Sequence, residues 1–288
     1  MHERSMLFGD DQGLVGTVCV PDGTARDVAL VLFNAGVVHR VGPHRLHVKL
    51  AREMASHGMA SIRFDLHGMG DSLRSGMTTG HGEQVVLDLR AAMDELQRAS
   101  GATRFALLGF CSGVPQSVAA ALADPRVASV LLYDGFALKT RRARMRYLGI
   151  RFRAHGFTLA AMRLWMRRAV QAAAESMRRV AAPSRAEAKS ARDTAFAQLR
   201  SLRERGVDVV VLAAGSDYSE FNYRDQAREA MGPYAEGLRF GFLDAVDHVL
   251  TSRKAQQDYI AWIRNALLQQ AQAETPAQAP APTLMCNS

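Results

Sequence analysis

The stretch that most constrains this chain is Gly109-Phe110-Cys111-Ser112-Gly113. It follows an apolar run at 105–108, which is short enough for a buried strand, and precedes a small-residue stretch at 117–123 with helix-forming composition. A strand, two glycines flanking a nucleophilic residue at a distance of two, and a helix form the pattern of a nucleophile elbow. In such a turn the central residue is strained, and side chains at the glycine positions would collide with the neighbouring strand and helix. Cys111 would then lie at a helix N-terminus, which favours negative charge and suits a thiolate nucleophile.

The same five residues also fit a small buried cysteine between two packing glycines, because so short a pattern occurs by chance. The rest of the chain has to decide between these interpretations. Strand-like and helix-like segments alternate on both sides of the turn. We expect strands at 14–20, 28–33, 60–66, 105–108, 127–133, 207–213 and 238–243, and helices at 43–58, 83–100, 117–123, 221–231 and 252–270. This alternation predicts an α/β fold with a mostly parallel, doubly wound sheet that binds ligands at the carboxyl ends of its strands.

One segment, 139–205, interrupts the alternation. It contains no strand-like run, its apolar residues recur at helical spacing, and it holds 18 Lys and Arg against 4 Asp and Glu. The rest of the chain holds 18 against 24, so the net charge of +8 comes from this segment alone. We therefore predict an α/β core in two parts, 1–135 and 206–270, a basic helical cap at 136–205 and a disordered tail at 271–288. The basic surface is either simply solvated or a dock for an anionic partner.

A nucleophile, an acid and a base follow predicted strands in the order Cys111, Asp217, His248. Because the carboxyl ends of parallel strands meet at one edge of a sheet, these side chains can converge there. His248 would take the proton of Cys111 and later protonate the leaving group, while Asp217 would orient the imidazole. Each residue also has an ordinary structural interpretation, and Asp244 or Asp247 could orient His248 instead of Asp217. Occurrence of all three in this order favours a catalytic triad.

The oxyanion formed on an attacked carbonyl needs two backbone N–H donors. We expect one from Ser112, directly after the nucleophile, and the other from Val37 in the loop that follows the strand at 28–33. Ser112 itself is a poor nucleophile candidate, because its side chain occupies the position after the tip of the turn.

Over residues 14 to about 268 the chain resembles the α/β-hydrolase superfamily, through LFNAGVVHRVGPHR, SIRFDLHGMGDS, GFCSG, AAGSD and DHV. It is most similar to the serine aminopeptidase-like and thioesterase-like branch, which includes hydrolases associated with bacterial exosortase loci. The resemblance implies a sheet of about eight strands, a cap inserted after the sixth, and the roles given above. Two departures stand out: Asn34-Ala35-Gly36 replaces the usual His-Gly of the oxyanion loop, and Cys111 replaces the usual serine. Dienelactone hydrolases and polyhydroxyalkanoate synthases also use cysteine, but their elbows usually carry glycine where this chain has Val114.

The remaining composition excludes several classes. Three cysteines do not suggest a disulfide framework, and together with a charged N-terminus lacking a signal-peptide core they fit a cytoplasmic protein. We find no cluster of residues at metal-ligand spacing, no phosphate-binding glycine loop, and hence no expected metal or cofactor. No run approaches the roughly 20 apolar residues of a membrane span.

The predicted function is hydrolysis of an acyl thioester or ester through an acyl-enzyme on Cys111. The alternative is an acyltransferase that passes the acyl group to an alcohol or amine, because a thioester acyl-enzyme reacts with all these acceptors. A phosphate of a pantetheine arm, coenzyme A or an acidic acyl carrier protein would suit the basic cap. Nucleic acid is a weaker candidate, since the basic stretch has few interleaved aromatic residues and no recognised module.

Overall fold

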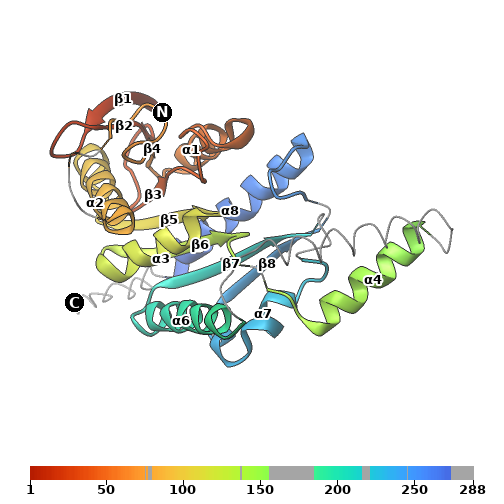
Figure 1. Cartoon of the computed structure of the whole chain (residues 1–288). Helices are drawn as coiled ribbons and strands as arrows, with labels where there is room; N and C mark the ends of the chain where they lie inside the picture. The colour runs from red at the N-terminus through yellow and green to blue at the C-terminus, as the bar shows by residue number, and fades with distance from the viewer. Residues whose placement is uncertain are drawn as a thin grey trace, which may run out of the picture.

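The chain folds around one eight-stranded sheet (Figure 1). The structure, a computed structural model, describes residues 1–74, 76, 80–136, 138–155, 185–215, 221–244 and 246–273. The strands are β1 (His2–Phe8), β2 (Leu14–Val20), β3 (Val28–Leu32), β4 (Ser61–Asp65), β5 (Arg104–Phe110), β6 (Val127–Tyr133), β7 (Asp208–Ala214) and β8 (Arg239–Leu243). They are ordered β1-β2-β4-β3-β5-β6-β7-β8; β2 pairs antiparallel with both of its neighbours, β1 and β4, and all other neighbouring strands pair in parallel. The predicted α/β class with a mostly parallel sheet is confirmed.

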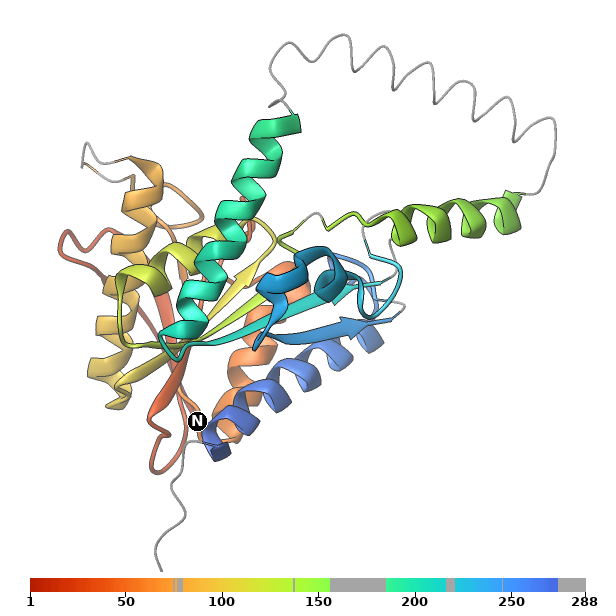
Figure 2. The ribbon, with the colours of Figure 1, turned by 90° about the horizontal axis from the view of Figure 1, so that it is seen from below.

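Helices cover both faces of the sheet, as Figure 2 shows edge-on. One face packs against α1 (Leu46–Ser56) and α8 (Arg253–Ala273). The other packs against α2 (His81–Ser100), α3 (Gly113–Ala123), α6 (Arg185–Glu204), α7 (Gln226–Met231) and the short η2 (Gly232–Ala235). Within β3, alternate residues enter the two cores, Ala29 and Val31 on one side and Leu30 and Leu32 on the other. Burial on both faces explains why the central strands read as unbroken apolar runs.

One of the eight strands, β1, has no counterpart among the seven strands expected from the sequence. Its first four residues are exposed, so it lacks an apolar run. It is held instead by antiparallel pairing with β2 and by Glu3, which accepts hydrogen bonds from Arg63 at 2.9 Å and Arg52 at 2.7 Å. These partners lie 60 and 49 residues away in the sequence.

The predicted cap, 136–205, contains two described helices that behave differently. The first, α4 (Arg141–His155), begins after β6 and extends away from the sheet in Figure 2. The second, α6, buries Phe196, Leu199 and Leu202 in the core beside β7. The C-terminal half of α6 therefore belongs to the layer that covers the sheet, whereas α4, the other described helix of the predicted cap, extends away from that layer. Residues 156–184 lie outside the described part of the chain.

The chain end differs slightly from expectation. The last helix, α8, continues to Ala273, two residues past the predicted start of the disordered tail at 271, and the rest of that tail falls outside the described residues. Among the helices that the structure describes, none is both long enough and apolar enough to span a bilayer.

Candidate active site

The strained turn predicted at Cys111 is present between β5 and α3. Cys111 has a φ of 53°, in the left-handed region that side chains rarely adopt. A Cβ on Gly109 would lie 2.8 Å from the Ser117 Oγ and 2.9 Å from the Val114 Cα, and one on Gly113 would lie 3.2 Å from the Phe33 ring. Close approach of the neighbouring helix therefore requires glycine at 109, whereas a side chain at 113 would be a tight fit against Phe33. The turn places Cys111, which is partly buried, two residues before the N-terminus of α3.

His248 lies in the loop after β8 and is held by a carboxylate. Its Nδ1 is 3.0 Å from the Asp134 Oδ2, and 41% of its side-chain surface is exposed against 9% for Asp134. Asp134 follows the last residue of β6 and has a φ of 49°. Its other oxygen, Oδ1, accepts a hydrogen bond from the Ala214 N–H at 2.8 Å, so the carboxylate is fixed by β7 while it faces the imidazole. Asp134 is placed to orient His248 and to stabilise its charged form.

Asp134 is the residue that sequence reasoning did not assign to the site. The predicted orienting residue, Asp217, lies outside the described part of the chain, so its position stays a prediction. Of the alternatives, Asp247 turns its carboxylate to the Thr251 N–H and Oγ1, at 2.9 and 2.7 Å. The signal for Asp134 was available, because Asp134 directly follows the strand predicted at 127–133, whereas Asp217 comes four residues after the end of the strand predicted at 207–213.

The end of β6 joins the turn at Cys111 to the His248 loop. The Cys111 N–H donates to the Tyr133 carbonyl at 2.8 Å. The Tyr133 ring lies nearly parallel to the His248 ring, with centroids 6.1 Å apart, and the Phe110 ring lies 5.7 Å from His248. Phe110, which precedes Cys111, and Tyr133, which accepts the Cys111 N–H, therefore both lie against the His248 loop.

The loop after β3, which was predicted to supply an oxyanion donor, lies against the elbow. Gly36 has a φ of 58°, and a Cβ there would lie 3.6 Å from the Ser112 Oγ. Val37 is 91% exposed, and within the described residues neither its N–H nor that of Ser112 donates to another protein group. The neighbouring Val38 N–H, by contrast, donates to the Ala35 carbonyl at 3.1 Å. The two predicted donors, Val37 and Ser112, therefore keep their hydrogen-bonding capacity for a ligand.

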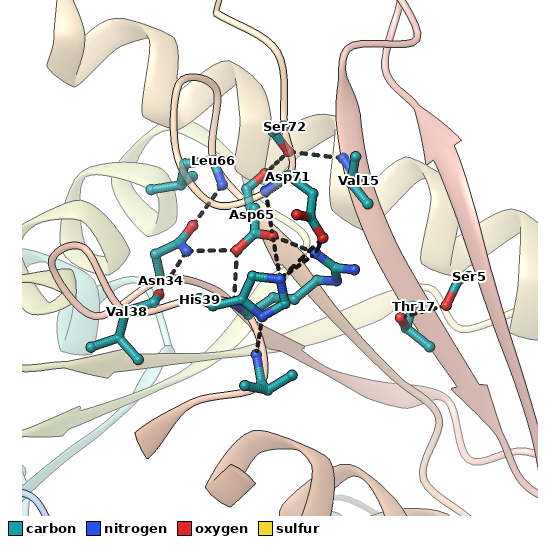
Figure 3. A network of polar contacts seen from close by, with 12 residues as sticks. Ser5, Val15, Thr17, Asn34, Val38, His39, Asp65, Leu66, Asp71 and Ser72 are labelled. Carbon is teal, nitrogen blue, oxygen red and sulfur yellow. Dashed lines mark hydrogen bonds and ion pairs between the residues drawn. The ribbon is translucent and has the colours of Figure 1, made fainter. Parts of the chain in front are cut away.

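Asn34 fixes this loop from beneath (Figure 3). Its Nδ2 donates to the Val38 carbonyl and to the Asp65 Oδ1, both at 2.8 Å, and its Oδ1 accepts from the Leu66 N–H at 2.6 Å. Asn34 is 2% exposed and Asp65 is fully buried. Asn34 thus uses both ends of its amide, which ties the loop after β3 to the end of β4.

The buried Asp65 carboxylate is neutralised by Arg40. Its Oδ1 accepts from the Arg40 N–H at 2.7 Å, and its Oδ2 accepts from the Arg40 guanidinium at 2.6 Å. His39, Asp65 and Asp71 bring potential metal-ligand atoms within 4.8 Å of one another. However, the Arg40 Nη1 also contacts the Asp71 Oδ2 at 2.6 Å, so the guanidinium already supplies positive charge at this cluster. Figure 3 shows His39, Asp65 and Asp71 turned toward one another.

No family model and no curated protein sequence matches the chain. Solved structures do match over nearly the whole length. An α/β serine hydrolase homologue from Coxiella burnetii has 14% identity and a TM-score of 0.57, with 93% of this chain and 98% of that one covered. An esterase from Pyrococcus furiosus has 14% identity and a TM-score of 0.56 (94% and 91% covered), and a dienelactone hydrolase from Anabaena variabilis has 13% and 0.54 (93% and 96%).

The chain has the α/β-hydrolase fold. Within this α/β-hydrolase fold, the turn between β5 and α3 carries a cysteine at its tip and a serine one position later. The loops after β3, β6 and β8 meet that turn, so the site combines a thiol, an imidazole paired with a carboxylate, and two unengaged backbone donors. At identities of 14% and below, these neighbours establish the fold alone, and the chemistry has to be argued from the residues.

Proposed function

We propose that this protein hydrolyses an acyl thioester or ester by way of an acyl-enzyme on Cys111. The observation that carries the proposal is the arrangement at the end of β6. The Tyr133 carbonyl accepts the N–H of Cys111, and the next residue, Asp134, holds the His248 imidazole. A nucleophile on a strained turn and a carboxylate-paired base, held by adjacent residues of one strand, is the arrangement that nucleophilic catalysis requires.

In the proposed reaction the Cys111 sulfur attacks the acyl carbonyl carbon, and its proton resides on His248. The carbonyl π electrons move to oxygen, and that oxyanion accepts hydrogen bonds from the N–H groups of Ser112 and Val37. The carbon–sulfur or carbon–oxygen bond to the leaving group then breaks, and His248 protonates the departing thiol or alcohol. Water, deprotonated by His248, attacks the acyl-enzyme, which releases the acid and returns the proton to the Cys111–His248 pair. The neighbouring carboxylate of Asp134 stabilises the charged imidazole at each stage.

The same acyl-enzyme supports acyl transfer as the second candidate. A thioester acyl-enzyme reacts with alcohols and amines as well as with water, so the products distinguish the two activities. Free acid in the presence of an added acceptor indicates hydrolysis, whereas an ester or amide formed in preference to free acid indicates a transferase.

The proposal is tested with Cys111→Ala against Ser112→Ala on acyl-thioester substrates, with thiol release as the readout. We expect Cys111→Ala to abolish release and Ser112→Ala to keep measurable activity. Intact mass spectrometry of the wild type, incubated with a panel of acyl thioesters, should show an acyl mass gain that is absent from the Cys111→Ala variant. Normal hydrolysis by the Cys111→Ala variant would refute the proposal.

We further propose that α4 binds the anionic part of a carrier thioester, the phosphate of a pantetheine arm. Four exposed arginines lie in its first two turns: Arg141, Arg142, Arg144 and Arg146. Among the residues described, none of them forms an ion pair with a carboxylate. The start of the helix is fixed, because the Thr140 Oγ1 accepts the Ala143 N–H at 3.0 Å and lies 2.7 Å from the Tyr223 hydroxyl. A positive surface that begins at the carboxyl end of β6 would attract such a substrate.

This partner is tested by replacing Arg141 and Arg144 with Ala, which leaves the stacking of Arg142 and Arg146 on Tyr223 intact. We expect KM for an acyl-coenzyme A to rise severalfold, kcat to stay within twofold, and KM for a matched acyl thioester without phosphate to remain unchanged. The same acyl group is also offered on an acyl carrier protein. The lower of the two KM values, for acyl-coenzyme A or for the acyl carrier protein, shows which carrier is the preferred source of the phosphate. If the wild type and the Arg141→Ala, Arg144→Ala variant have equal KM values on all three substrates, the proposed role of α4 is contradicted.

A further inference from the structure

Tyr133 is the one described residue that has direct hydrogen bonds to both the nucleophile turn and the loop of the base. Its carbonyl accepts the Cys111 N–H at 2.8 Å. Its hydroxyl lies 3.3 Å from the carbonyl oxygens of both Asp247 and His248. The residue is fully buried at the end of β6, and its ring runs parallel to the His248 imidazole, at an interplanar angle of 10°.

The hydroxyl group is fixed as a donor. Burial, and then the nearby Asp134 charge, raise the pKa of Tyr133 well above its ordinary value, so the hydroxyl keeps its proton. With one proton and two carbonyl acceptors at equal distance, it makes a three-centre hydrogen bond to two successive peptides, the ones on either side of the His248 Cα.

We propose that Tyr133 is a positioning residue, which sets the distance between Cys111 and His248 by holding the backbone of both. Asp134 fixes the orientation of the imidazole ring through its side chain. The main chain of the His248 loop is also held at its far end, where the Leu250 carbonyl accepts a hydrogen bond from the buried Gln256 Nε2 at 2.9 Å, and Thr251 caps the exposed Asp247 side chain. At His248 itself, the Tyr133 hydroxyl joins this main chain to the end of β6.

The inference rests on the proposed function, because the distance that Tyr133 sets matters only if sulfur and imidazole exchange a proton. A shift of about 1 Å in a reacting group can reduce a rate by about two orders of magnitude. Loss of one neutral hydrogen bond leaves the ring in place and moves the loop by less than this, so we expect an effect of about tenfold.

The chain offers a matched control in the same aromatic cluster. Tyr259 packs edge-on against Tyr133, with ring centroids 4.9 Å apart, and it is also fully buried. Its hydroxyl has no hydrogen-bond partner among the described residues. Removal of the Tyr259 hydroxyl therefore changes the same core by the same atom without releasing the His248 loop.

The experiment compares Tyr133→Phe with Tyr259→Phe in the full chain. Two readouts are used: hydrolysis of an acyl thioester, and the rate of Cys111 alkylation by iodoacetamide at pH 7. For Tyr133→Phe we expect kcat to fall about tenfold with KM within twofold, and alkylation to slow severalfold, because the thiolate loses its nearby imidazole. Tyr259→Phe should match the wild type in both readouts. Thermal melting checks that both variants, which keep their ring contacts, remain folded.

The outcomes separate this inference from the proposed function. A folded Tyr133→Phe variant with wild-type alkylation and wild-type kcat overturns the positioning role while the proposed function stands. Equal losses in Tyr133→Phe and Tyr259→Phe also overturn it, since they would indicate a general effect on the core. A wild-type protein that neither turns over thioesters nor alkylates at Cys111 overturns both.

Discussion

The two loops that flank Cys111 are supported in opposite ways. The loop after β3, with Asn34, rests on a buried network in which the Asp65 carboxylate accepts hydrogen bonds from Asn34 and Arg40. The loop after β8 carries His248, which is 41% exposed and is held through Asp134 and the Tyr133 hydroxyl. We call these the Asn34 side and the His248 side of the site.

The difference matches what each side would do in the proposed reaction. Donors for an oxyanion work best when they are fixed before charge develops, because reorganising them would consume the energy they supply. An imidazole that takes a proton from sulfur and delivers it to a leaving group needs some freedom and some contact with the substrate. We therefore expect mutations on the Asn34 side, where the polar network is buried, and on the His248 side, where the imidazole is 41% exposed, to affect stability and activity to different extents.

The largest effect is expected on the His248 side, from Asp134→Asn. The amide keeps the shape of the side chain but removes the charge that pairs with the imidazole, so we expect kcat to fall by about 10³-fold or more. The measurement is steady-state hydrolysis of an acyl thioester. Asp217→Asn is the matched variant. If Asp217→Asn causes the large loss while Asp134→Asn stays active, the predicted Asp217 is the orienting acid, and Asp134 no longer defines the His248 side.

A smaller effect is expected from acid on the Asn34 side, through His47 on α1. His47 is buried, its main-chain N–H donates to the Val41 carbonyl at 3.1 Å, and burial lowers its pKa to about 4. The unfolded chain, in which histidine has a pKa near 6.5, then binds more protons than the folded one between these values. Stability is complete above about pH 6.5 and decreases as the pH falls, by roughly 3 kcal/mol at pH 4.

Urea denaturation from pH 7 to pH 4 measures this dependence. His47→Met, an apolar residue that cannot titrate, should lose about 3 kcal/mol less than the wild type over that range. Identical pH profiles for the two proteins would show that His47 is not the acid-sensitive group beneath the loop.

The smallest effect is expected from Asn34→Ala. The change leaves the buried Leu66 N–H without its acceptor and the Val38 carbonyl without its donor. We expect a loss of about 2 kcal/mol in the free energy of unfolding at pH 7. Unchanged stability would mean that the Asn34 network does not support its side of the site.

The sequence predicted the Asn34 side less completely than the elbow, and the reason is physical. The turn at Cys111 is encoded locally, because two glycines and a strand–helix junction lie within a few residues. The network of Asn34, Arg40 and Asp65 joins two loops, and no spacing rule relates an asparagine to an aspartate 31 residues later. The edge strand β1 escaped prediction for the same reason: its pairing with β2 and the Glu3–Arg63 ion pair stabilise it, and neither leaves an apolar pattern.

The assignment of Asp134 shows a second limit. Asp134 and Asp217 both follow predicted strands, so a rule based on strand ends permits either. The distinction depends on where each carboxylate points, and that is set by neighbours such as the Ala214 N–H. A parallel sheet brings strand ends together, but the contacts of individual side chains decide which of them meet.

The left-handed backbone conformation of Cys111 has a consequence for the stability of this protein. Glycine adopts this conformation freely, but here a residue with a side chain adopts it. The strain that exposes the sulfur therefore lowers the free energy of unfolding. Replacement of Cys111 by glycine would give a more stable protein without the thiol that the proposed reaction needs. The energetic cost of this conformation is consistent with the catalytic use that we propose for the thiol.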